Sequence, residues 1–292
     1  TPTQLSGMEV ADVGALTSVQ VGVLSTEQFA AFSSAQLATL NATQVAGWST
    51  AQITSLSPDA LAALDTAQFA GLTTAQLASI SPEQAAALPG SSIAALNSAQ
   101  IRALDPSAFG ALSSAAVVAL GTHQMPALST QQLNSLSAEQ LQVLETRDLA
   151  ALNTAQIASL ATAQLDALDT VQLSSLVTHQ VKALNTAQIA SLEATDLAAL
   201  NTLQYAVMTT AQLAAITSVQ GAALEGADLA ALSVAQVRAL GPQTIAALSE
   251  AAIAGLGTLQ MGALTSAQLA TLSVDQMAAI ETRDLVQIGL PQ

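Results

Sequence analysis

The sequence contains no cysteine, so it can form neither a disulfide framework nor a thiolate metal site. It has five basic residues against twenty acidic ones, giving a net charge of −15. This balance argues against nucleic-acid binding, because phosphate contacts need clustered Lys and Arg. Charged residues make up only 9% of the chain, which excludes a charge-rich disordered tail. No run of eighteen apolar residues exists, so we expect no transmembrane segment.

An eight-residue repeat runs from Thr1 to residue 288 without insertion or deletion, giving thirty-six octads. The consensus is [Ser/Thr/Asn/Asp]-Thr-Ala-Gln-[Leu/Ile/Val]-Ala-x-Leu, as in Ser33–Leu40 and Asn153–Leu160. Position eight is large and apolar in every octad, and position five in all but Ala85 and Gly221. Position four is Gln in twenty-five octads and Asp in five. We expect one continuous array over 1–292, as a segment of a longer array or a processed chain.

Each octad is predicted to form a short capped helix. Gln, Ala and Leu favour helix, and positions five and eight, three residues apart, share a helix face but would point to opposite faces of a strand. Positions one and four have the spacing of a capping box. Proline occurs at position two in five octads, where the first turn of a helix tolerates it. The pattern therefore predicts a helix of about one and a half turns followed by a bend.

One octad cannot be stable alone. Ordering its backbone costs roughly 1–2 kcal/mol per residue, whereas two buried side chains return roughly 2–3 kcal/mol each and a cap about 1 kcal/mol. Neighbouring octads must therefore stack their position-five and position-eight faces into a shared core. We expect an all-α solenoid wound into a superhelical rod. The sequence leaves the number of octads per turn open.

Five octads carry Glu at position one together with Asp at position four. They are Glu9 with Asp12, Glu145 with Asp148, Glu193 with Asp196, Glu225 with Asp228, and Glu281 with Asp284. Two carboxylates in one first turn suggest a calcium site, but calcium takes six to eight oxygen ligands. Acidic groups are also favoured at a helix N-terminus by its dipole. We favour the variant cap, because two carboxylates fall short of the ligands that calcium takes. Arg147 and Arg283 would also partly neutralise two of the pairs.

The remaining chemistry is sparse. His123 and His179 occur at position three without acidic partners in their octads, and are interpreted as surface substitutions. Ser and Thr occur at cap positions rather than beside a His, so no nucleophile motif is formed, and we expect neither an enzyme nor a cofactor. The aromatic residues occupy positions five and eight, which predicts a packing role.

The octads Ser49–Leu56, Thr73–Ile80 and Asn185–Leu192 resemble low-complexity repeats of very large secreted bacterial proteins described as adhesin- or haemagglutinin-like. The resemblance covers the whole chain and transfers no functional residues. It implies a bacterial extracellular or cell-surface location, with cell-surface or matrix contacts.

Three functions are compatible with these features. The first is a structural protein, a rod, stalk or filament of the cell surface or biofilm matrix, whose exposed core faces would stack end to end in self-association. The second is an adhesive or ligand-binding solenoid. Ser57–Leu128, the stretch that deviates most from the consensus, would be its contact zone or a kink, but we favour sequence drift as the origin of the deviation. The third is an adhesin stalk stiffened by calcium at the acidic pairs.

Overall fold

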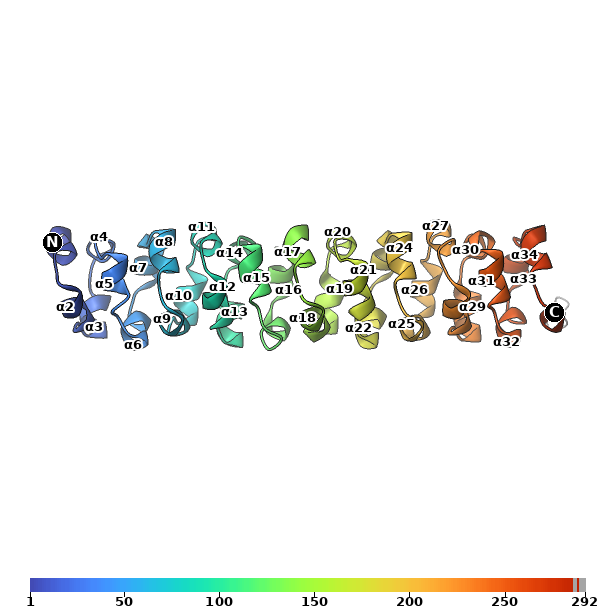
Figure 1. Ribbon diagram of the computed structural model, residues 1–292, viewed down its shortest axis with the longest axis horizontal. Coiled ribbons are helices and arrows are strands. Elements are labelled where there is room, and N and C mark those ends of the chain that lie inside the picture. The colour runs from blue at the N-terminus through green and yellow to red at the C-terminus, as the bar shows by residue number, and fades with distance from the viewer. Residues whose placement is uncertain (286–287, 289–292) are drawn as a thin grey trace. The chain divides into compact units, whose positions relative to one another are not determined.

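The computed structural model describes residues 1–285 and residue 288. Throughout this part of the chain the secondary structure is helical, with no strand. The chain divides into two compact units, Thr1–Leu152 and Asn153–Gln292, which we call unit 1 and unit 2. The order of their helices is shown in Figure 1.

Unit 1 consists of helices of three to six residues, one in nearly every octad. They are α1 (Pro2–Ser6), α2 (Val10–Gly14), α3 (Ser18–Gly22), α4 (Thr26–Phe29), α5 (Ser34–Leu37), α6 (Ala42–Ala46), α7 (Thr50–Ser55), α8 (Pro58–Ala62), α9 (Thr66–Ala70), α10 (Thr74–Ala78), α11 (Pro82–Ala86), α12 (Gly90–Ala94), α13 (Ser98–Ala103), α14 (Pro106–Gly110), α15 (Ser114–Val118), the 3-10 helix η1 (Met125–Ala127), α16 (Thr130–Asn134), α17 (Ala138–Gln142) and α18 (Thr146–Ala151).

Unit 2 repeats this arrangement. Its helices are α19 (Thr154–Ser159), α20 (Thr162–Asp166), α21 (Thr170–Ser175), α22 (Thr178–Ala183), α23 (Thr186–Ser191), α24 (Ala194–Ala198), α25 (Thr202–Val207), α26 (Thr210–Ala214), α27 (Ser218–Gly221), α28 (Gly226–Ala230), α29 (Val234–Ala239), α30 (Pro242–Ala247), α31 (Glu250–Ala254), α32 (Thr258–Met261), α33 (Ser266–Leu269), α34 (Val274–Ala278) and α35 (Thr282–Leu285).

The predicted capping box starts most of these helices. In α7, the backbone N–H of Ser49 donates to Gln52 Oε1 at 2.8 Å, and the N–H of Gln52 donates to Ser49 Oγ at 3.2 Å. The helix ends at Ser55, and its C-cap residue Leu56 is extended, with φ of −67° and ψ of 139°. Pro58 begins α8 at its first position, as predicted for proline at position two. The prediction of one short capped helix per octad is therefore confirmed.

Positions five and eight form the core, as predicted. Ile53 and Leu213 are 0% exposed, and Leu72 at position eight is 1% exposed. Of the two exceptions in size at position five, Gly221 has a steric cause. A Cβ atom on Gly221 would lie 2.8 Å from the carbonyl oxygen of Thr244 in α30, so the close packing of α27 on α30 requires glycine there.

The stacking of helices defines a solenoid in each unit. Helices three places apart pack on one another, for example α8 on α11 and α11 on α14 in unit 1, and α27 on α30 in unit 2 (Figure 1). Within each unit, side-chain hydrogen bonds of position-four glutamines also join many octads to the octad four places earlier, as described below. One turn of the solenoid therefore contains between three and four octads, which the sequence had left open. In the described residues, no helix has the length and apolar character needed to cross a lipid bilayer.

Candidate functional site

The most regular polar feature of both units is the position-four glutamine. The side-chain Nε2 of Gln52 donates to the carbonyl oxygens of Val21 and Leu24, both at 2.9 Å. These residues are 31 and 28 positions earlier, at positions five and eight of the octad four places before. Meanwhile Oε1 of the same amide accepts from Ser49. One buried amide therefore caps its own helix and joins two turns of the solenoid. We call this double contact of Nε2 the glutamine bridge.

The glutamine bridge recurs throughout both units. Its second acceptor is always the carbonyl 28 residues earlier, and its first lies 30 or 31 residues earlier. Described bridges are formed by Gln36, Gln44, Gln52, Gln68, Gln76, Gln84, Gln100, Gln124, Gln132 and Gln140 in unit 1, and by Gln188, Gln204, Gln212, Gln220, Gln236, Gln260, Gln268 and Gln276 in unit 2. The capping half of this role was predicted from sequence, whereas the bridging half was missed.

Other residues at position four change the bridge. Ala60, Ala108, Ala116 and Ala252 have no side-chain donor and cannot form one. Thr244 keeps half of it, because its Oγ1 donates to the carbonyl of Ile216, 28 residues earlier, at 2.8 Å. A hydroxyl on a short side chain therefore reaches the same acceptor that the glutamine amide uses.

The Glu and Asp side chains of the five acidic pairs differ in burial. Each Glu is exposed, and where it is the N-cap residue, as in Glu145 and Glu193, its side chain makes no cap hydrogen bond. The Asp residues are buried except Asp12, which is exposed. The pairs thus occupy the first turn of a helix, as the cap interpretation supposes, but the Glu side chain does not replace the Ser or Thr of a capping box.

Arginine neutralises the two pairs that contain it. Arg147 Nε lies 2.7 Å from Glu145 and 4.0 Å from Asp148. Arg283 Nε lies 2.9 Å from Glu281 and 3.5 Å from Asp284, which also accepts from the hydroxyl of Thr258 at 2.6 Å. The guanidinium groups are about two-thirds exposed, so these ion pairs contribute little to stability.

The Glu193 and Asp196 pair lacks an arginine and meets further carboxylates. Burial raises the pKa of Asp196, and the negative charges of Glu193, Asp166 and Asp169 raise it further. The pKa of Asp166 is raised by burial and by Glu193, although a hydrogen bond with Ser191 opposes this. This end of α20 and the start of α24 therefore form an acidic cluster in unit 2.

The geometry of the acidic pairs provides no set of ligands for calcium. Within residues 1–285 and 288, no group of three or more His, Asp or Glu side chains is arranged to hold a metal ion. His123 and His179 are both exposed. We therefore assign none of the acidic pairs as metal ligands.

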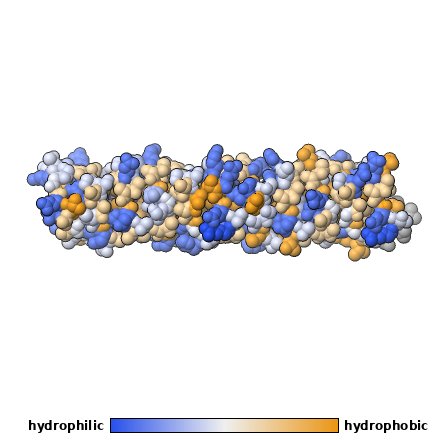
Figure 2. All heavy atoms as spheres, in the orientation of Figure 1, coloured by the Kyte–Doolittle hydropathy of each residue, from blue (hydrophilic) through white to orange (hydrophobic). Residues whose placement is uncertain are grey.

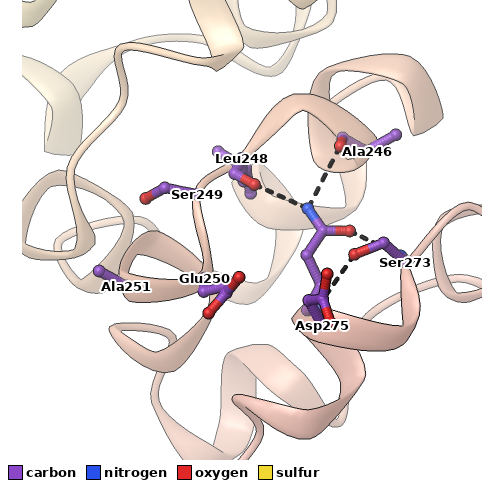
Figure 3. Close-up of a pocket in the computed structure, with 8 residues that line it drawn as sticks. Ala246, Leu248, Ser249, Glu250, Ala251, Ser273 and Asp275 are labelled. Atoms are coloured by element: carbon purple, nitrogen blue, oxygen red, sulfur yellow. Dashed lines mark hydrogen bonds between the residues drawn. The ribbon is translucent and has the colours of Figure 1, made fainter.

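An open groove of about 530 Å³ lies between α31 and α34 in unit 2 (Figure 3). Glu250 and Asp275 lie on opposite sides of it. The hydroxyls of Ser249 and Ser273 accept from backbone N–H groups at 3.1 and 3.0 Å, so both act as helix caps. The glutamine bridge of Gln276 forms its wall, with Nε2 donating to Leu248 at 2.7 Å. The two serines and Gln276 therefore already serve the helix caps and the contact between turns.

In residues 1–285 and 288, aromatic side chains lie in the core and exposed apolar side chains are scattered. Phe29 packs against Trp48 with ring centroids 4.8 Å apart, and both are buried, as predicted from their positions in the octad. Exposed apolar residues such as Leu259 and Val274 are scattered, and the face in Figure 2 shows apolar atoms in small groups among hydrophilic ones.

Comparison with known families identifies the repeat. The family model of the ALTTAQ repeat matches residues 5–42, 93–130, 141–178, 189–225 and 221–258, which together are more than half of the chain. Every match begins at position five of an octad, so the family's repeat and the octad share one frame. No curated protein matches the chain.

Proposed function

The chain belongs to the ALTTAQ repeat family, and we propose that it is a structural repeat protein, a stalk or spacer of the bacterial cell surface or extracellular matrix. The glutamine bridge is the observation that carries this proposal. Because the octads that form a bridge bind the octad four places earlier through the same contacts, the array can be lengthened without any new type of contact. Stability in such an array is approximately a sum over repeats and their neighbours. This property suits a protein that acts as a spacer, where the length of the array determines the distance it spans.

The same contacts support end-to-end self-association. In the described residues, Gln20 and Gln28 form capping boxes without a bridge from their Nε2 atoms. A second copy that offers its own position-five and position-eight carbonyls would supply acceptors for these Nε2 atoms. An open filament follows when such a head-to-tail contact does not close into a ring.

A deletion series tests the spacer function. Removing Asn185–Leu240, which is seven whole octads, keeps every remaining octad in frame. We expect the maximum dimension from small-angle X-ray scattering to fall in proportion to the octads removed, with helical content per residue unchanged. The matched control removes residues 185–236 and leaves half an octad, which interrupts the frame of the bridges. If the in-frame deletion leaves the dimension unchanged, or loses as much helix as the control, the chain is not an extendable spacer.

Electron microscopy over a concentration series tests self-association. We expect filaments with a regular axial repeat at high concentration, and fewer filaments from the double variant Gln20→Ala, Gln28→Ala. Its control, Gln212→Ala, removes an internal bridge. Unassociated particles at every concentration would refute the end-to-end contact and leave the spacer function standing.

A further inference from the structure

The bridge at position four requires a hydrogen-bond donor, because both of its acceptors are carbonyl oxygens. An ionised Asp has only acceptors. Asp148 is 2% exposed, and Asp196 and Asp228 are each 7% exposed. The carbonyls 28 residues before them belong to Leu120, Leu168 and Leu200. At the octad position from which glutamine donates to such carbonyls, an Asp carboxylate has no hydrogen to donate.

Thr244 shows that a short side chain is long enough for this contact. Its hydroxyl reaches the carbonyl 28 residues earlier at 2.8 Å. The carboxyl oxygens of Asp are one bond farther from the backbone than the threonine hydroxyl. A protonated Asp has one O–H donor, like threonine.

We propose that Asp148, Asp196 and Asp228 are proton-binding sites whose protonated carboxyl groups donate to the carbonyls of Leu120, Leu168 and Leu200, so that acidification strengthens the contacts between turns of the solenoid. The proton takes the place of the amide hydrogen that glutamine provides in the other octads. The behaviour follows from the fold alone, whatever the role of the array.

The surroundings of Asp148 favour protonation of its carboxylate. Its Oδ1 is buried and has no hydrogen-bond partner. Burial raises its pKa, the nearby Arg147 lowers it, and Glu145 raises it. The arginine is exposed and lies closer to Glu145, at 2.7 Å, than to Asp148, at 4.0 Å. Oδ1 of the Asp148 carboxylate therefore has no hydrogen-bond donor. A protonated carboxyl group would instead donate a hydrogen bond from this buried position.

The other two sites have no arginine in their octads. Burial raises the pKa of Asp196, and the carboxylates Glu193, Asp166 and Asp169 add to the rise. Burial and Glu225 raise the pKa of Asp228, while a backbone hydrogen bond with Glu225 opposes them.

Tyr205 settles which carbonyl Asp228 would use. Its hydroxyl donates to the carbonyl of Leu197, 31 residues before Asp228, at 2.7 Å. The carbonyl of Leu200, 28 residues before Asp228, is left for the proton of Asp228. By contrast, Asp284 accepts from Thr258 and pairs with Arg283, so it is satisfied as a carboxylate and is not included.

The direction of the effect follows from the raised pKa values. Where the folded state holds a proton more tightly than the unfolded state, stability is present below the unfolded pKa and is lost as the pH rises through the folded pKa. These three residues therefore weaken the folded state at neutral pH relative to glutamine, and the difference disappears in acid. This is the reverse of the usual behaviour of a carboxylate that is paired in the folded state.

The test compares the chain with the triple variant D148Q, D196Q, D228Q, which installs the consensus residue and should therefore fold. Thermal melts followed by circular dichroism between pH 3.5 and 7.5 give the difference in Tm at each pH. We expect the variant to melt about 3–6 °C higher at pH 7, and the difference to approach zero at the acidic end. A difference that does not change with pH would overturn the proposal.

Three further measurements identify the cause. The reciprocal variant Gln212→Asp should acquire the pH-dependent loss, whereas Gln212→Ala should be weaker by the same amount at every pH. Carboxyl carbon NMR should show Asp148, Asp196 and Asp228 titrating above the ordinary Asp value of 3.8. Titration at or below that value refutes protonation. So does a rise in the neutral-pH Tm of the unmodified chain on adding calcium that the triple variant lacks, because a metal ion would then be the bridging group.

Discussion

Replacing Gln52 by alanine should show how much one glutamine bridge stabilises the fold. The side chain is 0% exposed and takes part in three hydrogen bonds, one accepted from Ser49 and two donated to Val21 and Leu24. A buried hydrogen bond contributes about 0.5–1.5 kcal/mol net, and the groups left unpaired add to the loss. We therefore expect Gln52→Ala to lower the free energy of unfolding by about 2–4 kcal/mol.

Gln28→Ala is the matched control for this substitution. Gln28 accepts from the N–H of Ser25 at 2.9 Å and forms no bridge, so its removal tests the capping half alone. We expect this variant to lose about 0.5–1 kcal/mol. The helix propensity gained by alanine is common to both variants and cancels in the comparison.

The assay is urea denaturation at neutral pH, followed by the fluorescence of Trp48, the sole tryptophan of the chain. Trp48 is buried in unit 1, where both substitutions lie, and Gln76 donates to its carbonyl at 2.8 Å. The midpoint and the slope must be reported together, because a changed slope would mean that the cooperative unit has changed. If Gln52→Ala costs no more than Gln28→Ala, the bridge does not stabilise the solenoid.

Two further predictions concern packing. Leu213→Ala should lower the free energy of unfolding by about 2–5 kcal/mol, because Leu213 is 0% exposed. Leu259 is 80% exposed, so Leu259→Ala should stay within about 0.5 kcal/mol of the unmodified chain in the same urea titration. Gly221→Ala should lower the melting temperature, because its Cβ would lie 2.8 Å from the Thr244 carbonyl oxygen, whereas Gly7→Ala, whose nearest neighbouring atom would be 3.5 Å away, should leave it unchanged or raise it. Equal melting temperatures for the two glycine variants would contradict the steric argument.

The local parts of this fold could be predicted from the sequence because their partners are close in the chain. The capping box joins residues three apart, as in Ser49 and Gln52, so its spacing is visible in any octad. The shared face of positions five and eight follows from helical geometry in the same way. Both predictions are confirmed by the burial and hydrogen bonds of the described residues.

The glutamine bridge could not be predicted because its acceptors depend on the pitch of the solenoid. Nothing within an octad states that the carbonyl of Leu24 lies beside Gln52, 28 residues later. The capping box also gave a sufficient reason for glutamine at position four, so no part of the pattern was left unexplained. The burial of Asp148 and Asp196 could not be predicted either, because nothing within their own octads indicates it.

Position four emerges as the place where sequence variation adjusts the contact between turns without altering the octad. Glutamine supplies a cap acceptor and two bridge contacts, threonine at Thr244 supplies one contact, and alanine at Ala60 supplies none. Helices form in all three cases, because positions five and eight still provide the core. The strength of the contact between turns can therefore differ from one octad to the next while the architecture stays the same, and in the octads of Asp148, Asp196 and Asp228 the proposed proton sites make it dependent on pH.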